Sequence, residues 1–318
     1  MQNKRQFTVI GSGQYIYDII KKREYPEGFV IGKRNRFEET VIQETTGGTC
    51  GNVMCMLNFF GWHVMPQAQF GTDPMGLKHT QSLADEGCDM RYVENIDGGT
   101  CSIIRFTHGL DQKTGLHKLG RRGEGPDGSM FRKVKNLRAK DEAPALLARI
   151  DEAPDVYFFD SYEAGYRALA AGLKERGSLV YFEAESCKEL SKFMKSAEIA
   201  DIVKFSDENI PDISVVEGLK GKLLIQTLGA QGLRFRLPGG DWVNVPPSKV
   251  ENCVDWEGCG DTTTATFLNE LGRMGLPKIA ELTEEQVRTA LEKACRQAAR
   301  CTQHIGSKGW MRAGDIAE

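Results

Sequence analysis

The sequence lacks any long apolar run, and this absence limits where the protein acts. None of its apolar runs reaches the roughly 18 residues needed to cross a bilayer. The polar start, residues 1–6, leads into the strand-like residues 7–10 without the charged and apolar regions of a secretory signal. A net charge of −3 gives no overall attraction to nucleic acid. We therefore expect a cytoplasmic protein without a membrane or nucleic-acid partner.

Metal-binding and disulfide patterns are also missing. The nine cysteines contain no Cys-x-x-Cys pair, and the five histidines have no spacing typical of a metal site. We expect reduced thiols and no structural zinc. Cys259 is expected to be the reactive cysteine, because it lies between two glycines at a predicted helix start, where the pKa of a thiol is lowered.

The most informative segment is DWEGCGD, residues 255–261, in which a Gly-x-Gly pair opens a predicted helix. Glycines let the backbone approach a ligand closely, and the first N–H groups of a helix attract an anion. A carboxylate beside bound phosphate is unfavourable unless a metal or a chemical task justifies it. The combination suggests phosphoryl transfer to a hydroxyl, with Asp261 as the base. A glycine-rich turn with Asp261 as a helix cap is the alternative.

A second motif lies near the N-terminus, where TGGTCGN at residues 46–52 precedes an apolar run that ends at Gly61, followed by GTDPMG at 71–76. These residues resemble the first signature of the ribokinase-like (PfkB) carbohydrate kinases, and residues 255–261 resemble the second. The two signatures stand in the family's order, roughly 200 residues apart. The resemblance covers nearly the whole chain.

The chain reads as a single α/β domain over residues 1–318. From residue 140 on, short apolar strands alternate with amphipathic segments, which predicts a mostly parallel sheet with helices on both faces. Strands are expected over 156–159, 179–182, 202–205 and 223–225. Helices are expected over 51–60, 75–86, 143–151, 163–176, 188–196, 261–274 and 284–304. Two β-rich insertions, about 14–45 and 91–120, interrupt the alternation; in the resembling family such a small sheet is a lid over the sugar and often a homodimer contact.

The resemblance implies an ATP-dependent sugar kinase. Asp261 would be the general base, and the backbone N–H groups that meet the transferring phosphoryl would be those of Gly258, Cys259 and Gly260. The residues expected to bind the sugar are Asp18, Gly47, Gly48, Asn52 and Arg105. The residues expected along the nucleotide are Thr227, Gly229, Gly232 and Lys204.

The metal region departs from the family pattern. Ser206 and Asn209 occupy the places of the family's Asn-x-x-Glu, so Glu208, or alternatively Asp207, is expected to supply the carboxylate for Mg²⁺, together with Asp255. Trp256 also stands where the family usually has Thr. The last helix and loop, residues 294–308, resemble the segment that in many members flanks the adenine and a monovalent cation such as K⁺.

Other functions stay open at this point. A nucleoside kinase of the same fold would need an aromatic sandwich for the base, which the β-rich insertions have the residues to supply. A non-catalytic sugar or nucleotide sensor is favoured by the altered Asn-x-x-Glu segment and opposed by the intact Gly-x-Gly-Asp. A dehydrogenase is disfavoured, because the glycine pair at 11–13 lacks its third glycine and a following helix. The sequence does not name the sugar.

Overall fold

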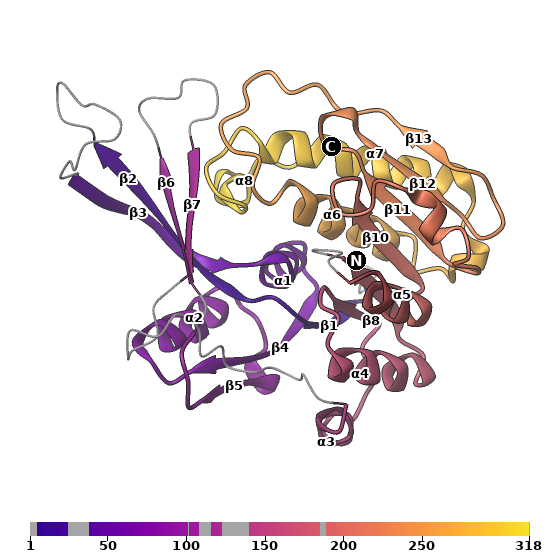
Figure 1. The fold of residues 1–318 in the computed structure, drawn as a ribbon, viewed down its shortest axis with the longest axis horizontal. Helices are drawn as coiled ribbons and strands as arrows, with labels where there is room; N and C mark the ends of the chain where they lie inside the picture. Colours follow the sequence, from indigo (N-terminus) through magenta and orange to yellow (C-terminus); the bar gives the residue numbers. More distant parts are fainter. Residues whose placement is uncertain are drawn as a thin grey trace.

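The computed structural model describes residues 5–24, 38–100, 102–107, 116–122, 140–184 and 189–317, with backbone only at 102–107 and 116–122. The described residues form a nine-stranded sheet in the order β13-β12-β11-β10-β9-β8-β1-β4-β5 (Figure 1). All pairs from β5 to β11 are parallel, and β12 and β13 add an antiparallel edge. The strands are β1 (Thr8–Ser12), β4 (His63–Gly71), β5 (Val93–Ile96), β8 (Val156–Phe159), β9 (Leu179–Glu183), β10 (Ile202–Ser206), β11 (Leu223–Thr227), β12 (Leu233–Arg236) and β13 (Val243–Val245).

Helices cover both faces of this sheet, as the sequence predicted. On one face lie α1 (Thr49–Phe59), α2 (Pro74–Asp85), α6 (Cys259–Arg273), α7 (Glu284–Cys301) and α8 (Gly309–Ala313), and on the other lie α3 (Glu142–Arg149), α4 (Ala164–Glu175) and α5 (Leu190–Ile199). Short 3₁₀ turns occur at Met90–Tyr92, Ile213–Val216, Gly229–Gln231 and Ile279–Glu281. None of the helices in the described ranges is both long and apolar enough to span a bilayer.

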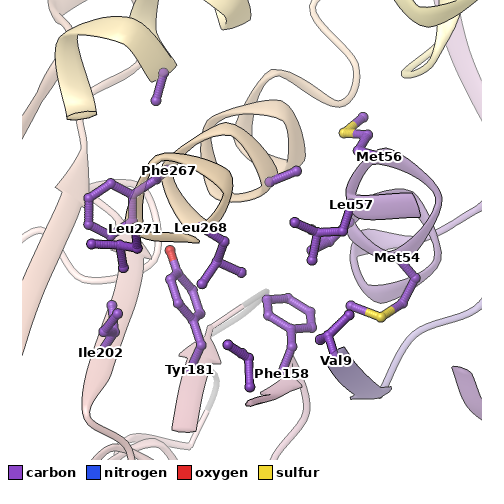
Figure 2. Close-up of a cluster of buried hydrophobic side chains, with 14 of the residues drawn as sticks. Val9, Met54, Met56, Leu57, Phe158, Tyr181, Ile202, Phe267, Leu268 and Leu271 are labelled. Carbon is purple, nitrogen blue, oxygen red and sulfur yellow. The ribbon is translucent and has the colours of Figure 1, made fainter. Parts of the chain in front are cut away.

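The central strands β8, β9 and β10 are mainly apolar because both of their faces are buried. Alternate side chains enter two different cores, so Phe158 packs toward α1 and α6 while Tyr157 and Phe159 pack toward α3 to α5. Figure 2 shows Phe158 and Tyr181 directed from the sheet toward Leu268 of α6. The core therefore fixes α1 and α6 side by side above one face of the sheet.

The lid is a separate four-stranded sheet in the order β3-β2-β6-β7, formed by β2 (Ile16–Glu24), β3 (Glu38–Gly47), β6 (Ser102–Thr107) and β7 (Leu116–Arg122). It extends away from the main body in Figure 1. The expected second insertion begins too early, because Val93–Ile96 pairs with β4 as the edge strand of the large sheet. The lid strands of that insertion begin only at Ser102, after the edge strand is complete.

Helix starts are the second difference from the sequence prediction. α1 and α6 each begin two residues earlier than expected, directly after Gly48 and Gly258. Both glycines have positive φ values, 79° and 80°, which a residue with a side chain adopts only under strain. The earlier starts place Asn52 and Asp261 in the first turns of two neighbouring helices.

Candidate functional site

The candidate site lies where the parallel strands end. Ser12, Glu183, Ser206 and Thr227 are the last residues of β1, β9, β10 and β11, and Asp160 directly follows β8. In open α/β sheets, ligands bind beyond the carboxyl ends of the strands. The loop before α6 and the start of α1 both lie at this edge, so the two motifs predicted from sequence meet here.

Asp261 is held by a chain of two side chains, each from a distant segment of the sequence. Asn52 Nδ2 donates to Asp261 Oδ2 at 2.7 Å, and Ser307 Oγ donates to Asn52 Oδ1 at 2.8 Å. Asn52 and Ser307 are 5% and 2% exposed. Because Asn52 is itself fixed on its oxygen side, its amide donates to the carboxylate in one orientation. The Ser307–Asn52–Asp261 chain thus orients the predicted base.

The pKa of Asp261 is raised to about 7, mainly because burial disfavours its charged form and also because Glu183 lies nearby. The Asn52 hydrogen bond and the Lys204 charge act in the opposite direction. A carboxylate with a pKa near neutrality is suited to accept a proton from a hydroxyl. Perturbed groups of this kind gather at functional sites.

The loop before α6 is shaped by close packing against residues 302–307. A Cβ on Gly258 would lie 2.3 Å from the Cβ of Ser307, so this position requires glycine. Val254 N and Asp255 N both donate to Thr302 O, at 2.7 and 3.0 Å. Cys259 N donates to Trp256 O at 3.3 Å, so this predicted phosphoryl donor already has an acceptor within the loop. The next N–H groups, of Gly260 and Asp261, belong to the first turn, where a helix supplies no acceptor of its own.

Lys204 supports the loop before α6 by a hydrogen bond to the backbone that follows it. Lys204 is 3% exposed, and its ammonium forms an ion pair with Glu183 and donates to Gly260 O at 2.9 Å. Thr264 Oγ1 donates to the other oxygen of Glu183 at 2.5 Å. Lys204 was predicted to lie along the nucleotide; the structure places its ammonium against the Gly260 carbonyl at the start of α6, where Glu183 neutralises its charge.

Asp18, Gly47, Gly48 and Asn52, four of the residues predicted for the sugar, are linked to one another by close contacts. Asp18 on β2 is 4% exposed, and a Cβ on Gly47 would lie 2.3 Å from Asp18 Oδ2. Gly48 N-caps α1, whose first turn carries Asn52. Arg105 pairs with Ile20 in the lid by its backbone, and its side chain lies outside the described residues. Asp18, the glycine pair and Asn52 therefore converge, although Asn52 bonds Asp261 itself.

The residues predicted for the nucleotide form a turn at the next strand ends. Thr227 pairs with Ser206, and Asp207 N donates to Thr227 O at 3.0 Å. Gly229 and Gly232 have φ values of 55° and 92° and close the turn into β12. A Cβ on Gly232 would lie 2.4 Å from Val245 O, so the turn also depends on the absence of a side chain.

The two predicted metal ligands have different surroundings. Glu208 is exposed and follows β10 next to the Thr227 turn. Asp255 is 2% exposed, and its oxygens accept from Glu257 N at 3.0 Å and Gly306 N at 2.8 Å. Within the described ranges there is no group of three or more His, Cys, Asp or Glu side chains arranged to hold a metal. Trp256, next to Asp255, is 52% exposed and does not pack into the core.

Four contributors to the site were missed by the sequence reasoning: Asp160, Glu183, Ser307 and Lys308. The oxygens of Asp160 accept from Gln14 N and Cys50 N, each at 2.9 Å, and Lys308 Nζ donates to Thr46 O at 2.8 Å. Asp160 and Glu183 had a usable signal, because each is the polar residue at the end of a predicted apolar strand. Ser307 and Lys308 had none beyond their place in the C-terminal loop.

This architecture is the ribokinase-like fold. The chain is similar to ribokinase from Giardia lamblia (TM-score 0.69, 16% identity, 95% of each chain covered). It is similar to fructokinase from Vibrio cholerae O395, whose structure contains fructose, ADP and a calcium ion (TM-score 0.66, 19% identity, 96% of each chain). A third similar structure is Burkholderia thailandensis nucleoside kinase with inosine (TM-score 0.64, 17% identity, 96% of this chain and 94% of that chain). No protein-family model matches the sequence, and comparison with curated protein sequences gave no match.

Proposed function

We propose that this protein is an ATP-dependent kinase that phosphorylates a hydroxyl of a small carbohydrate, with Asp261 as the general base. The observation that carries the proposal is the Asp261 carboxylate itself. It lies in the first turn of α6 beside a positive-φ glycine, is held by Asn52, and has its pKa raised to about 7. A carboxylate in the first turn also stabilises a helix, but burial that raises its pKa to about 7 offsets this benefit, which favours a chemical role.

The proposed reaction uses groups already in place. Asp18 and Gly47 belong to the lid strands β2 and β3 and would hold the sugar, so that one hydroxyl meets the second carboxylate oxygen of Asp261. The N–H groups of Gly260 and Asp261 would stabilise charge on the transferring phosphoryl. Lys204 would keep the Gly260 carbonyl turned away from that charge, since its ammonium binds this oxygen.

The nucleotide would lie along the turn formed by Thr227, Gly229 and Gly232. Glu208 fits the Mg²⁺ that such a nucleotide carries, because it is an exposed carboxylate beside this turn. When bound, Mg²⁺ neutralises phosphate charge while keeping several water ligands. Asp255 fits a loop-fixing role, since both oxygens accept backbone N–H groups.

Similar structures support the choice of substrates. The fructokinase structure contains fructose and ADP, which are a sugar and a nucleotide product of the proposed kind. The nucleoside kinase structure contains inosine, so nucleosides belong in the same substrate panel. A cytoplasmic location and a homodimer through the lid stay predictions. The lid strand β3 exposes two apolar side chains that a dimer contact would cover, Val41 at 48% and Ile42 at 46%. Light scattering would test the dimer.

The test is ADP release with ATP and Mg²⁺ against ketoses, aldoses, sugar acids and nucleosides. We expect turnover with at least one sugar that disappears in Asp261→Asn. Activity retained in that variant would refute the role of Asp261. No turnover with any compound, combined with sugars that raise the melting temperature, would replace the kinase with a sugar-binding sensor.

A further inference from the structure

Two cysteines, Cys259 and Cys301, meet at the segment 255–261, which we call the anion loop. Cys259 is the first residue of α6, and Cys301 is the last residue of α7. Their contacts are reciprocal: Cys259 Sγ donates to Ala298 O at 3.7 Å, three residues before Cys301, and Cys301 Sγ donates to Glu257 O at 3.6 Å, two residues before Cys259. Each thiol thus reaches toward the other's chain segment, which places the two side chains next to one another.

This pair has access to the surface that the other thiol pair lacks. Cys55 and Cys88 are also hydrogen bonded, but they are 1% and 7% exposed. Cys259 is half-buried while Cys301 is fully buried. Cys253, six residues before Cys259, is exposed and is not bonded to another thiol in the described residues. A small oxidant therefore reaches the Cys259 thiol first. The buried Cys301 thiol lies behind Cys259.

The electrostatics of the pair differ from the sequence prediction. The pKa of Cys259 is raised, not lowered, because its thiol is hydrogen bonded to Cys301 and is partly removed from water. The same hydrogen bond lowers the pKa of Cys301. The helix start therefore does not make Cys259 a lone reactive thiol.

We propose that Cys259 and Cys301 form a reversible disulfide that switches off the anion loop. The oxidant is a hydroperoxide. The Cys259 sulfur attacks the peroxide oxygen, its proton passes to the leaving oxygen, the O–O bond breaks, and the products are a Cys259 sulfenic acid and the alcohol or water. Cys301 then attacks the Cys259 sulfur, the S–S bond forms and water leaves, so the two thiols lose two electrons and the peroxide gains them.

The disulfide changes the loop because it shortens the distance between the sulfurs. A disulfide holds its sulfurs at about 2 Å, closer than two hydrogen-bonded thiols can lie. The bond therefore draws the first turn of α6 toward the end of α7. Gly260 and Asp261 follow Cys259 directly, so their N–H groups are displaced with it. The Asp261 carboxylate then loses its alignment with Asn52. Formation of the disulfide is independent of the proposed kinase activity; its effect on turnover rests on that activity.

Peptide mapping after peroxide treatment tests the disulfide. Trypsin places Cys259 in residues 250–273, together with Cys253, and Cys301 in residues 301–308. Cys253→Ser is therefore the background for mapping, because it leaves Cys259 as the one thiol in its peptide. We expect the two peptides to be joined after treatment with hydrogen peroxide and separated by dithiothreitol. Free thiols in both peptides, or Cys259 oxidised to sulfinic acid without the joined product, would overturn the proposal.

Turnover gives the second readout. We expect at least a tenfold loss of ADP release after oxidation, restored by dithiothreitol. Cys301→Ala should keep its turnover under the same peroxide treatment, and the matched control Cys88→Ala, which breaks the other pair, should lose turnover as the wild type does. Equal loss in Cys301→Ala would overturn the switch. If no substrate is found at all, the proposed function fails while the mapping still decides whether the disulfide forms.

Discussion

Asp160 and Asp261 are two aspartates at the same edge of the sheet, and they have opposite environments. Asp160 is 1% exposed, and its two oxygens accept from the backbone N–H groups of Gln14 and Cys50. Asp261 is half-buried and accepts from one side-chain amide, that of Asn52. Backbone donors stabilise the ionised form and fix two loops, whereas burial with one donor leaves Asp261 able to take up a proton. The comparison separates an aspartate that holds the site together from one suited to chemistry.

The largest effect is expected from Asp261→Asn. The amide can still accept from Asn52, so the fold should persist, while loss of the base lowers kcat by about 10² to 10⁴. ADP release measures this with the sugar identified by the panel, and circular dichroism verifies the fold. A variant that turns over at the wild-type rate would remove the distinction between the two aspartates.

The same variant gives a stability prediction of definite sign. The folded pKa of Asp261, about 7, is above its unfolded value, so protonation of Asp261 stabilises the folded state. This contribution is complete below about pH 4 and is lost as pH rises through 7. Asp261→Asn should therefore gain stability relative to the wild type between these values. Urea unfolding at several pH values measures it, and a difference independent of pH would contradict the assignment.

Asp160→Ala is expected to lower the stability of the fold, whereas Asp261→Asn raises it. It leaves the N–H groups of Gln14 and Cys50 without their acceptor, which should cost about 2–3 kcal/mol of unfolding free energy. Because Cys50 lies in the first turn of α1, the sugar KM should rise more than kcat falls. Asp160→Asn, which keeps one acceptor oxygen, is the matched control and should be less destabilised. A stable Asp160→Ala with lowered kcat alone would make Asp160 the chemical residue.

The pH dependence of turnover sharpens the contrast further. The base must be ionised, so kcat/KM should fall as pH drops below about 7, where the pKa of Asp261 lies, and approach a tenfold loss per pH unit. Glu183→Gln removes the nearby charge that raises this pKa, so its acid limb should move to lower pH. A pH profile that is unchanged in Glu183→Gln would show that Glu183 does not raise the pKa of Asp261.

The smallest effect is expected from Ser307→Ala. It removes the 2.8 Å hydrogen bond to Asn52 Oδ1 and leaves the Asn52–Asp261 bond in place. We expect a loss of about 1 kcal/mol of transition-state stabilisation, roughly a fivefold decrease in kcat/KM. Steady-state kinetics measures it, with Ser307→Thr as the control that retains the hydroxyl. A loss as large as that of Asp261→Asn would give Ser307 a direct part in the reaction.

The strands and helices that build the site were predictable because their patterns are local. The strand predicted over residues 156–159 matches β8, and the helix predicted over 163–176 matches α4 to within one residue at each end. Continuous apolar runs require burial on both faces, which a parallel sheet between helices provides. The lid boundary was wrong at residues 91–96, because a short strand with mixed exposure gives the same local pattern in either sheet.

The sequence by itself determined the α/β class, the two glycine-opened helix starts and the carboxylate beside one of them, since each depends on neighbouring residues. Only the tertiary structure decided which groups surround that carboxylate. Asn52 reaches Asp261 across more than 200 positions, Ser307 in turn reaches Asn52, Lys204 donates to Gly260 O in the first turn of α6, and Cys259 lies beside Cys301. These contacts depend on how α1, α6 and α7 pack on the sheet. Desolvation and neighbouring charge, which set the pKa of Asp261, follow from that packing and from no local pattern.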